Sequence, residues 1–364
     1  MKIDSISLWR VAVPLYEAYN TALGAMDTFD TIITEMRGAD GQIGIGECTI
    51  VPGYTHENGD GGWAFCRAQA EQLVGVDTSD GKARLDPYRL SDPHAVSVLQ
   101  VAMEMIEGNP ILAAPKAPVR VPILNTVNSK DLDVIPGEID SHIADGFGTL
   151  KIKVGWDVDK DLQRLAVIQQ ANAGRAKLRV DANQGFSQEQ AIRFADKLDP
   201  DSLQLFEQPC NSKDWDANAA VAAMSPVPVM MDESIYGVDD IDRAAAMKGC
   251  GFVKLKIAKM TGLDMLADGL RRIRELGLTP VLGNGAGPDA GCWIEACVAH
   301  DTIDNAGENC GFLKIREQLL ETPLTFEDGA IVLQPGFQAR FDHDVVERLS
   351  VDKVQFGTAA ATAA

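Results

Sequence analysis

Histidine is scarce in this chain, with 5 residues among 364, and none of the 7 cysteines forms a Cys-x-x-Cys pair. A zinc site or a disulfide framework is therefore not expected, and the cysteines are interpreted as mostly buried thiols. Long hydrophobic runs are also absent, because no stretch approaches the ~20 consecutive apolar residues of a membrane-spanning helix. The first fifteen residues include Asp4 and Arg10, which a secretory signal does not favour. We expect a cytoplasmic protein with no membrane contact.

Basic residues are few as well. The 33 Lys and Arg stand against 53 Asp and Glu, a formal net charge of −20. Such a surface repels phosphates, so no nucleic acid partner is expected, and an anionic substrate needs a local group of cations. Hydrophobic residues make up 46% and charged residues 24% of the chain, as in an ordinary globular protein. The length suits one large barrel or two domains.

From about residue 120 onward, short β-branched runs alternate with amphipathic stretches. In residues 158–168 and 263–273 the apolar positions recur every three or four residues, which is typical of helices. The alternation predicts βα units, and since no GxGxxG turn follows the first run, a (β/α)8-type barrel is favoured over an open doubly wound sheet. The eight expected strands are Pro122–Val127, Leu150–Val154, Lys177–Asn183, Leu203–Gln208, Val229–Glu233, Val253–Ile257, Thr279–Asn284 and Ile303–Glu308.

Residues 1–118 have a different pattern and predict a separate α+β domain. The polar stretches Tyr16–Met26 and Gly53–Gly62 are expected to be loops, either lids over a site or plain surface loops. The expected regular elements are the strand Ile3–Val13, a hairpin of Thr31–Met36 and Gln42–Glu47, and helices near Trp63–Leu73 and Val96–Ile106.

Acidic residues end three successive barrel strands. Asp181, Glu207 and Asp232 are separated by about one βα unit each, and catalytic groups of parallel barrels lie at the carboxyl ends of the strands. Three carboxylates held together repel one another unless a cation binds. All-oxygen ligation favours Mg²⁺, with Mn²⁺ as a substitute, over zinc. A helix cap or a loop salt bridge explains any one of these acids, but not all three in register.

Lysines end two other strands. Lys151 and Lys153 project from the same face of one strand, and their mutual repulsion together with burial predicts that Lys153 is a neutral general base. Lys256 lies across the barrel mouth, on a strand that three other strands separate from that of Lys151 and Lys153. One lysine on each face of a planar intermediate suits removal of a proton α to a carboxylate, with a metal stabilising the enediolate. Two alternatives stay open: the lysines only neutralise the acids, or Lys254 or Lys259 acts in place of Lys256.

These motifs together resemble the enolase superfamily, and within it the muconate lactonizing enzyme subgroup. The resemblance covers nearly the whole chain. The motifs that carry it are KIKVG at 151–155, VDANQGF at 180–186, FEQP at 206–209, MDES at 231–234 and KIAKMTGL at 256–263.

The resemblance implies an α+β capping domain, a (β/α)7β-type TIM-like barrel and a C-terminal segment that returns to the cap. It also implies a homo-oligomer. The expected segments are the cap with its active-site loops at 1–118, the barrel at 119–320, the returning segment at 321–356 and a disordered tail at 357–364. The implied roles are Mg²⁺ ligands for Asp181, Glu207 and Asp232, an acid–base pair for Lys153 and Lys256, and modulation of Lys153 by Lys151.

Two departures bear on the substrate. The mandelate racemase branch would have a histidine at the seventh strand end, where Gly283-Asn284-Gly285 stands. Dipeptide epimerases have Asp-x-Asp at the eighth strand, where residues 305–309 read NAGEN; this argues against a dipeptide, although Glu308 is able to meet a cationic group. The residues expected to bind substrate are Tyr19, Tyr54, Asn183, Asn284 and Glu308.

Two functions fit these residues. The first is a racemase or epimerase of a small carboxylate or amino-acid derivative, and the second is a lyase, either a dehydratase or a muconate-type cycloisomerase. A non-catalytic barrel protein is a remote alternative, because a scaffold has no reason to keep opposed lysines and three carboxylates.

Overall fold

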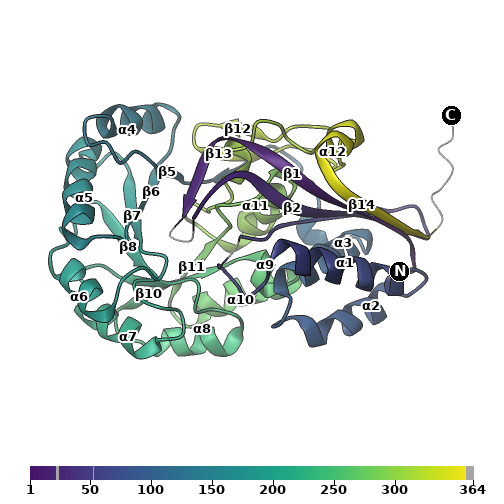
Figure 1. Cartoon of the computed structure of the whole chain (residues 1–364), viewed down its shortest axis with the longest axis horizontal. Coiled ribbons are helices and arrows are strands. Elements are labelled where there is room, and N and C mark those ends of the chain that lie inside the picture. The colour runs from purple at the N-terminus through teal and green to yellow at the C-terminus, as the bar shows by residue number, and fades with distance from the viewer. Residues whose placement is uncertain (22–23, 52, 358–364) are drawn as a thin grey trace.

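The computed structural model describes residues 1–21, 24–51 and 53–357. Figure 1 shows a barrel of strands surrounded by helices, and beside it a cap whose long strands cross one end of the molecule. The barrel contains a seven-stranded sheet and the cap a four-stranded sheet. This arrangement confirms the predicted α/β fold, a TIM-like barrel with an α+β cap.

The barrel sheet is parallel and runs in the order β11-β10-β9-β8-β7-β6-β5. Since strands consecutive in sequence are neighbours, their carboxyl ends line one rim. The strands are β5 Asn125–Val127, β6 Thr149–Lys153, β7 Lys177–Asp181, β8 Leu203–Glu207, β9 Val229–Met231, β10 Cys250–Leu255 and β11 Thr279–Leu282. The helices are α4 Ile135–Ala144, α5 Val158–Asn172, α6 Gln188–Asp196, α7 Trp215–Met224, α8 Val238–Ala245, α9 Ile257–Met260, α10 Leu263–Glu275 and α11 Asp289–Thr302.

The eighth expected strand, Ile303–Glu308, was wrong. This Asn- and Gly-containing segment makes an isolated bridge from Gly307 to Ile123, and its Glu308 N–H donates to the carbonyl of Leu282 at 2.8 Å. It closes the barrel between β11 and residue 123 without forming a strand, because Asn and Gly disfavour extended pairing.

The first expected strand, Pro122–Val127, was also wrong in extent. It is divided into β4 Val119–Pro122 and β5. Proline lacks the N–H that would continue the ladder, so β4 ends there. β4 pairs with β13 Ala330–Leu333, which also pairs with β12 Thr325–Glu327.

The cap sheet is antiparallel, in the order β14-β1-β2-β3. The expected loop Tyr16–Met26 was wrong, because β1 and β2 continue through it as a two-stranded ribbon up to Thr21 and from Gly24. The cap elements are β1 Ile3–Thr21, β2 Gly24–Gly38, β3 Ile43–Thr49, α1 Gly59–Leu73, α2 Thr78–Leu85 and α3 Pro93–Ile106. Short 3-10 helices are η1 Asp86–Tyr88, η2 Pro110–Leu112 and η3 Gly311–Leu313.

The C-terminal segment lies against the cap. After α12 His343–Leu349, the strand β14 Ser350–Gly357 pairs antiparallel with β1, and Figure 1 shows the two side by side. Gly357 is therefore part of a strand, and the rest of the expected tail, 358–364, lies outside the described residues. The domain boundaries themselves stay a prediction.

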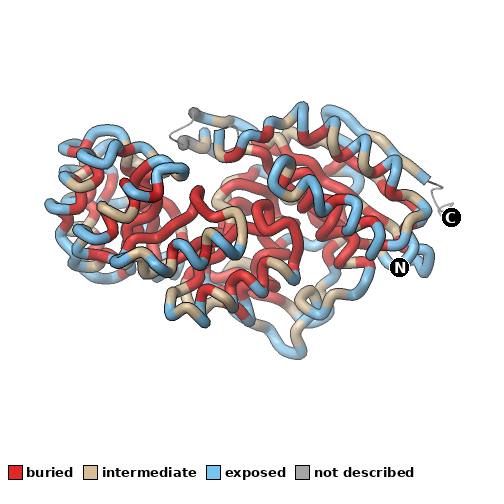
Figure 2. Tube along the Cα trace, turned by 90° about the horizontal axis from the view of Figure 1, so that it is seen from below, coloured by how far each residue is buried: buried red, intermediate tan, exposed pale blue. Residues whose placement is uncertain are grey.

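Buried residues fill the barrel and the space between the cap sheet and its helices, as Figure 2 shows. The seven cysteines are free and six of them are buried, which confirms the interpretation of buried thiols. Among the described helices, none has both the length and the apolarity needed to cross a membrane.

Candidate active site

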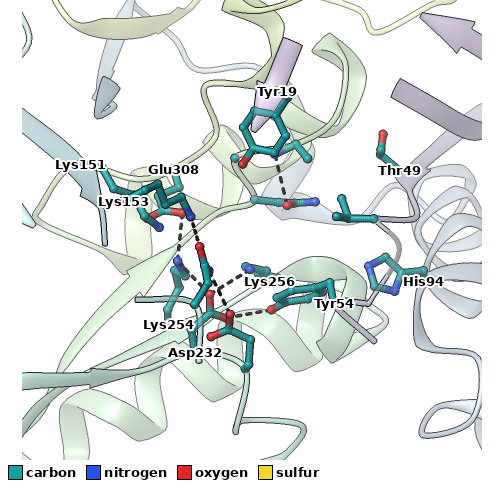
Figure 3. Close-up of a pocket in the computed structure, with 16 residues that line it drawn as sticks. Tyr19, Thr49, Tyr54, His94, Lys151, Lys153, Asp232, Lys254, Lys256 and Glu308 are labelled. Carbon is teal, nitrogen blue, oxygen red and sulfur yellow. Dashed lines mark hydrogen bonds and ion pairs between the residues drawn. The ribbon is translucent and has the colours of Figure 1, made fainter. Parts of the chain in front are cut away.

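The predicted site residues come together at the carboxyl ends of the barrel strands, beneath the cap (Figure 3). They surround a cavity of about 50 Å³, which has room for no more than a few water molecules. The predicted residues that line it are Tyr19, Tyr54, Lys151, Lys153, Asn183, Asp232, Lys256, Asn284 and Glu308. The two others, Asp181 and Glu207, are completely buried and contact Lys151.

The strand register explains why these charges converge. Lys153, Asp181 and Glu207 are aligned across β6, β7 and β8, and each is the last residue of its strand. Asp232 and Lys256 directly follow β9 and β10. Groups far apart in sequence thus meet on one rim.

Lys151 lies at the centre of the buried charges. Its Nζ lies 2.8 Å from Oδ2 of Asp181, 2.9 Å from Oε2 of Glu207 and 2.6 Å from Oε1 of Glu308. Burial alone lowers the pKa of Lys151, but the three carboxylates together raise it well above its usual value. Lys151 is therefore a permanent cation beside the predicted base.

The ammonium group of Lys153 faces the cavity from the end of β6. It lies 2.7 Å from Oδ2 of Asp181 and donates to Oδ1 of Asn183. Asn183 in turn donates to Oε1 of Glu233 at 3.0 Å. Its backbone has φ 40°, in the left-handed region that Asn tolerates. Asn183, predicted to bind substrate, thus also holds Lys153 in place.

Lys256 reaches the cavity from the opposite side of the barrel rim, and Tyr54 of the cap contacts it there. Nζ of Lys256 lies 3.0 Å from Oδ2 of Asp232 and 3.8 Å from the centre of the Tyr54 ring. The Tyr54 hydroxyl donates to Oδ1 of Asp232 at 2.8 Å. Burial and the charge of Asp232 raise the pKa of Tyr54 well above its usual value, so its hydroxyl stays a donor. The stretch Gly53–Gly62 therefore does reach the site.

Lys254, named above only as an alternative to Lys256, is part of the site. It lies on β10, is 1% exposed, and its Nζ is 3.0 Å from both Oδ2 of Asp232 and Oε2 of Glu308. It also pairs with Oε1 of Glu207. Burial lowers the pKa of Lys254, but these carboxylates raise it above its usual value. The site therefore contains a second permanent buried cation.

Glu308 binds two lysines at once. Its Oε1 accepts from Lys151 at 2.6 Å and its Oε2 accepts from Lys254 at 3.0 Å. Burial raises the pKa of Glu308, but the two cations outweigh burial and lower it well below the usual value. The cationic groups that Glu308 meets therefore belong to the protein, and both of its oxygens are engaged.

The acidic cluster has the composition of a Mg²⁺ site. Asp181, Glu207 and Asp232 are at most 1% exposed, and Oε2 of Glu207 and Oδ2 of Asp232 accept no hydrogen bond, although ammonium groups lie within 3.0 Å of them. Within residues 1–21, 24–51 and 53–357, no three acidic, imidazole or thiol groups stand together as a ready metal cage, because Lys151 and Lys254 each bridge two of the carboxylates. The donors fit Mg²⁺ in kind, and binding it requires these ammonium groups to move.

Tyr19 and Asn284 form another wall of the cavity. Oδ1 of Asn284 accepts from the N–H of Ala286 at 3.4 Å. Tyr19, on β1, lies edge-on to Phe29 with ring centres 5.8 Å apart, and Nζ of Lys314 is 5.4 Å from its ring centre. The Tyr19 hydroxyl and the Asn284 amide do not contact the acidic cluster. That these two residues bind substrate stays a prediction.

Two more charged residues lie at the site: Glu233, which the sequence did not single out, and Lys259, named above only as an alternative to Lys256. Oε2 of Glu233 accepts no hydrogen bond, and its pKa is raised by burial. Lys259 donates to the carbonyl of Asp232 at 2.8 Å, and burial lowers the pKa of Lys259 to about 8. Glu233 lies inside the motif MDES and Lys259 inside KIAKMTGL, each close to a residue with a predicted role.

Comparison with known proteins decides the family. Residues 138–345, more than half of the chain, match the family model described as enolase C-terminal domain-like. The chain belongs to this family. The match confirms the resemblance to the enolase superfamily and the prediction of an enzyme.

Individual proteins similar to this chain are epimerases and cycloisomerases. The L-Ala-D/L-Glu epimerase of Clostridium acetobutylicum is 26% identical over 278 residues, 72% of this chain and 76% of that enzyme. Muconate cycloisomerase 1 of Acinetobacter baylyi is 23% identical and spans 95% of this chain and 98% of its own. A crystal structure of the Cytophaga hutchinsonii dipeptide epimerase, complexed with Mg and D-Ala-L-Val, matches with a TM-score of 0.88 at 22% identity, covering 98% of this chain and all of that one. The expected class of chemistry, proton abstraction by an isomerase of this superfamily, is confirmed.

Proposed function

We propose that this protein is a Mg²⁺-dependent epimerase that removes and returns the α-proton of a small carboxylate, specifically an amino-acid derivative. The placement of Lys153 and Lys256 carries the proposal. They line one cavity from β6 and β10, which are separated in the sheet by β7, β8 and β9. Inversion at Cα needs a proton acceptor on one face of the substrate and a donor on the other.

Each lysine has its own supporting contacts for this work. Asp181 and Asn183 hold Nζ of Lys153, and Asp232 and the Tyr54 ring hold Nζ of Lys256. In the proposed reaction Lys153, in its neutral form, takes the α-proton, and the ammonium group of Lys256 delivers a proton to the opposite face. The roles are exchanged for the other enantiomer.

We assign the metal to Asp181, Glu207 and Asp232, with Mn²⁺ as a substitute for Mg²⁺. The support is the all-oxygen donor set, its burial, and two oxygens that accept no hydrogen bond. When bound, the cation supplies stabilisation of the negative charge that develops on the substrate carboxylate.

The contacts of Glu308 bear on the substrate's nitrogen. Because Lys151 and Lys254 engage both of its oxygens, Glu308 offers no free oxygen to a substrate ammonium group. Oε2 of Glu233, a residue of the cavity wall, accepts no hydrogen bond and is able to accept one from the nitrogen of a substrate. Since Glu308 has no free oxygen for an ammonium group, N-acylated amino acids are the first substrates to test, with dipeptides as the comparison.

Proton exchange in D2O tests the function directly. Proton NMR of N-acyl amino acids, dipeptides and other carboxylates, with enzyme and Mg²⁺, should show loss of an α-proton signal and formation of the other epimer. Lys153→Ala and Lys256→Ala should each reduce epimerisation by about 10³-fold or more while one enantiomer still exchanges, because one base remains. Lys160→Ala, at an exposed position of α5, is the matched control and should behave like wild type. Exchange that persists undiminished in both site variants would contradict the assignment.

A muconate-type cycloisomerase is the second candidate. The muconate cycloisomerase match spans 95% of this chain, whereas the L-Ala-D/L-Glu epimerase match spans 72%. The same NMR experiment separates the two, because a cycloisomerase or another lyase gives a product with a changed double bond or lactone ring and no epimer.

We also propose a cytoplasmic homo-oligomer. The support is the sequence pattern of an acidic chain and the family resemblance. Light scattering coupled to size exclusion should give a mass of at least twice the 39.2 kDa of one chain, and a mass of 39.2 kDa would contradict the oligomer.

A further inference from the structure

Lys254 is one of two lysines, with Lys151, whose ammonium groups bridge carboxylates of the proposed metal site. Lys254 pairs with Oε1 of Glu207 and with Oδ2 of Asp232, two of the three proposed Mg²⁺ ligands. Oδ2 of Asp232 is also an oxygen that accepts no hydrogen bond. A divalent cation and this ammonium group therefore compete for the same carboxylates.

Among the residues that the structure describes, the ammonium group of Lys254 has one carboxylate partner outside the proposed metal ligands. β10 is paired with β9 on one side and β11 on the other, so the backbone of Lys254 is fixed, and the side chain is 1% exposed. Within the described residues, its remaining carboxylate partner is Glu308, whose Oε2 lies 3.0 Å from Nζ. A charged side chain that deeply buried requires a partner.

We propose that Lys254 competes with a divalent cation for Glu207 and Asp232 and that the cation binds only when this ammonium group withdraws to Glu308. The inference rests on the proposed assignment of Mg²⁺ to Asp181, Glu207 and Asp232. Lys254 acts here as a positioning residue for the acidic ligands. It also leaves a positive charge a few ångströms from the bound cation, which weakens metal affinity by Coulomb repulsion.

Metal binding, measured without turnover, tests this role. Mg²⁺ is titrated by calorimetry and Mn²⁺ by the loss of the free-ion electron paramagnetic resonance signal, in wild type, Lys254→Met and Lys254→Gln. Both substitutions remove the competing charge, so we expect the Kd to fall by about tenfold or more. The glutamine variant keeps a polar group in the barrel in case methionine prevents folding.

Lys314→Met is the matched control. Lys314 also lies close to the cavity, but its Nζ donates to the carbonyl of Gly285 at 2.9 Å and to Sγ of Cys310 at 3.3 Å instead of to a carboxylate. Its substitution should leave the metal Kd within about twofold of wild type, because no acidic ligand is released.

Glu308→Gln tests the proposed resting place. Without the negative charge that attracts it to residue 308, Lys254 stays on Glu207 and Asp232, so the Kd should rise by about tenfold. A general loss of negative charge would also raise it, and the double variant Lys254→Met/Glu308→Gln separates the two explanations. In the double variant, we expect most of the Glu308→Gln effect to disappear.

The outcomes are distinct from those of the proposed reaction. The role of Lys254 is overturned if the metal Kd is unchanged or higher in both Lys254 variants. It is also overturned if neither the wild type nor any of the Lys254 variants binds metal. The proposed epimerase activity is tested separately, by proton exchange with Lys153→Ala and Lys256→Ala. Metal binding that is undetectable in wild type and measurable in Lys254→Met would support the competition most directly.

Discussion

The hydroxyl of Tyr54 donates a 2.8 Å hydrogen bond to Oδ1 of Asp232 and thereby joins the cap to the rim of the barrel. The ring of the same tyrosine covers Nζ of Lys256 at 3.8 Å and lies edge-on to His94 with ring centres 6.2 Å apart. The remaining cavity of about 50 Å³ is too small for an amino-acid derivative. Substrate binding therefore requires the cavity to widen, and we expect Tyr54 to move.

Tyr54→Phe should bind substrate more tightly than wild type. A hydrogen bond to a charged acceptor contributes about 1.5–3 kcal/mol, and this one stabilises the closed, substrate-free state. Its loss makes opening easier, so the KM for α-proton exchange should fall, by up to about tenfold. The measurement is the initial exchange rate against substrate concentration.

Tyr236→Phe is the control for this substitution. Tyr236 also lies against a buried lysine, with Nζ of Lys259 4.4 Å from its ring centre, but it has no contact with Asp232 comparable to that of Tyr54. Its KM should not change. A KM that rises in Tyr54→Phe would show that the hydroxyl contacts substrate, as the sequence suggested.

Much of the barrel and its charged rim could be predicted from sequence, because a parallel barrel puts strand ends at one edge. Asp181 and Glu207 end β7 and β8, and Asp232 follows β9, as the spacing predicted. The strand predicted at Ile303–Glu308 was wrong because this segment closes the barrel through a bridge at one residue, and a single bridge leaves no periodic pattern in the sequence. The stretch Tyr16–Met26 failed because a two-stranded ribbon that projects from a sheet lacks the apolar alternation of a buried strand.

Lys254 shows what the sequence leaves undetermined at the site. The Lys-x-Lys spacing of Lys254 and Lys256 repeats that of Lys151 and Lys153 and places both side chains on one face. The role of the first lysine depends on Glu308, which lies 54 residues later in the chain and meets it only in the closed barrel. A contact between residues so far apart in the sequence is seen only in the folded structure.

Gly283→Ala should be strongly destabilising. Gly283 has φ +127°, and a Cβ there would lie 2.7 Å from the backbone nitrogens of Glu308 and Asn309. The substitution pushes on the segment that closes the barrel, so we expect a loss of about 3 kcal/mol or more in the free energy of unfolding. Gly277→Ala is the control, since Gly277 has φ +79° and open space around it; it should cost about 1 kcal/mol. Urea unfolding measures both, and equal losses would rule out the steric explanation.

Asp161→Ala should loosen the end of β6. Oδ2 of Asp161 accepts hydrogen bonds from the backbone N–H groups of residues 155, 156 and 157 at 3.0, 3.1 and 3.2 Å, directly after Lys153. Without this acceptor, three donors lose their partner, and we expect about 2–4 kcal/mol of destabilisation together with a lower kcat. Asp159→Ala, which removes an exposed carboxylate from the same helix, should change stability by less than about 1 kcal/mol. Thermal unfolding and exchange kinetics of the two variants check the difference, and a kcat equal to wild type in Asp161→Ala would contradict the positioning role.

Glu104→Gln should flatten the pH dependence of stability. Glu104 of α3 accepts the N–H of Leu263 at 2.6 Å, at the contact between cap and barrel, and burial raises its pKa from 4.5 to about 7. Since the folded state binds the proton more tightly than the unfolded state, the stabilisation is complete below pH 4.5 and is lost as the pH rises through 7. The loss in wild type is on the order of 2 kcal/mol by pH 8, and glutamine, which cannot ionise but still accepts the hydrogen bond, should remove it. Denaturant unfolding at pH 5 and pH 8 measures the change, with the exposed Glu71→Gln as control. If the pH 5 to pH 8 difference is the same in Glu104→Gln and wild type, the buried carboxyl of Glu104 is not its source.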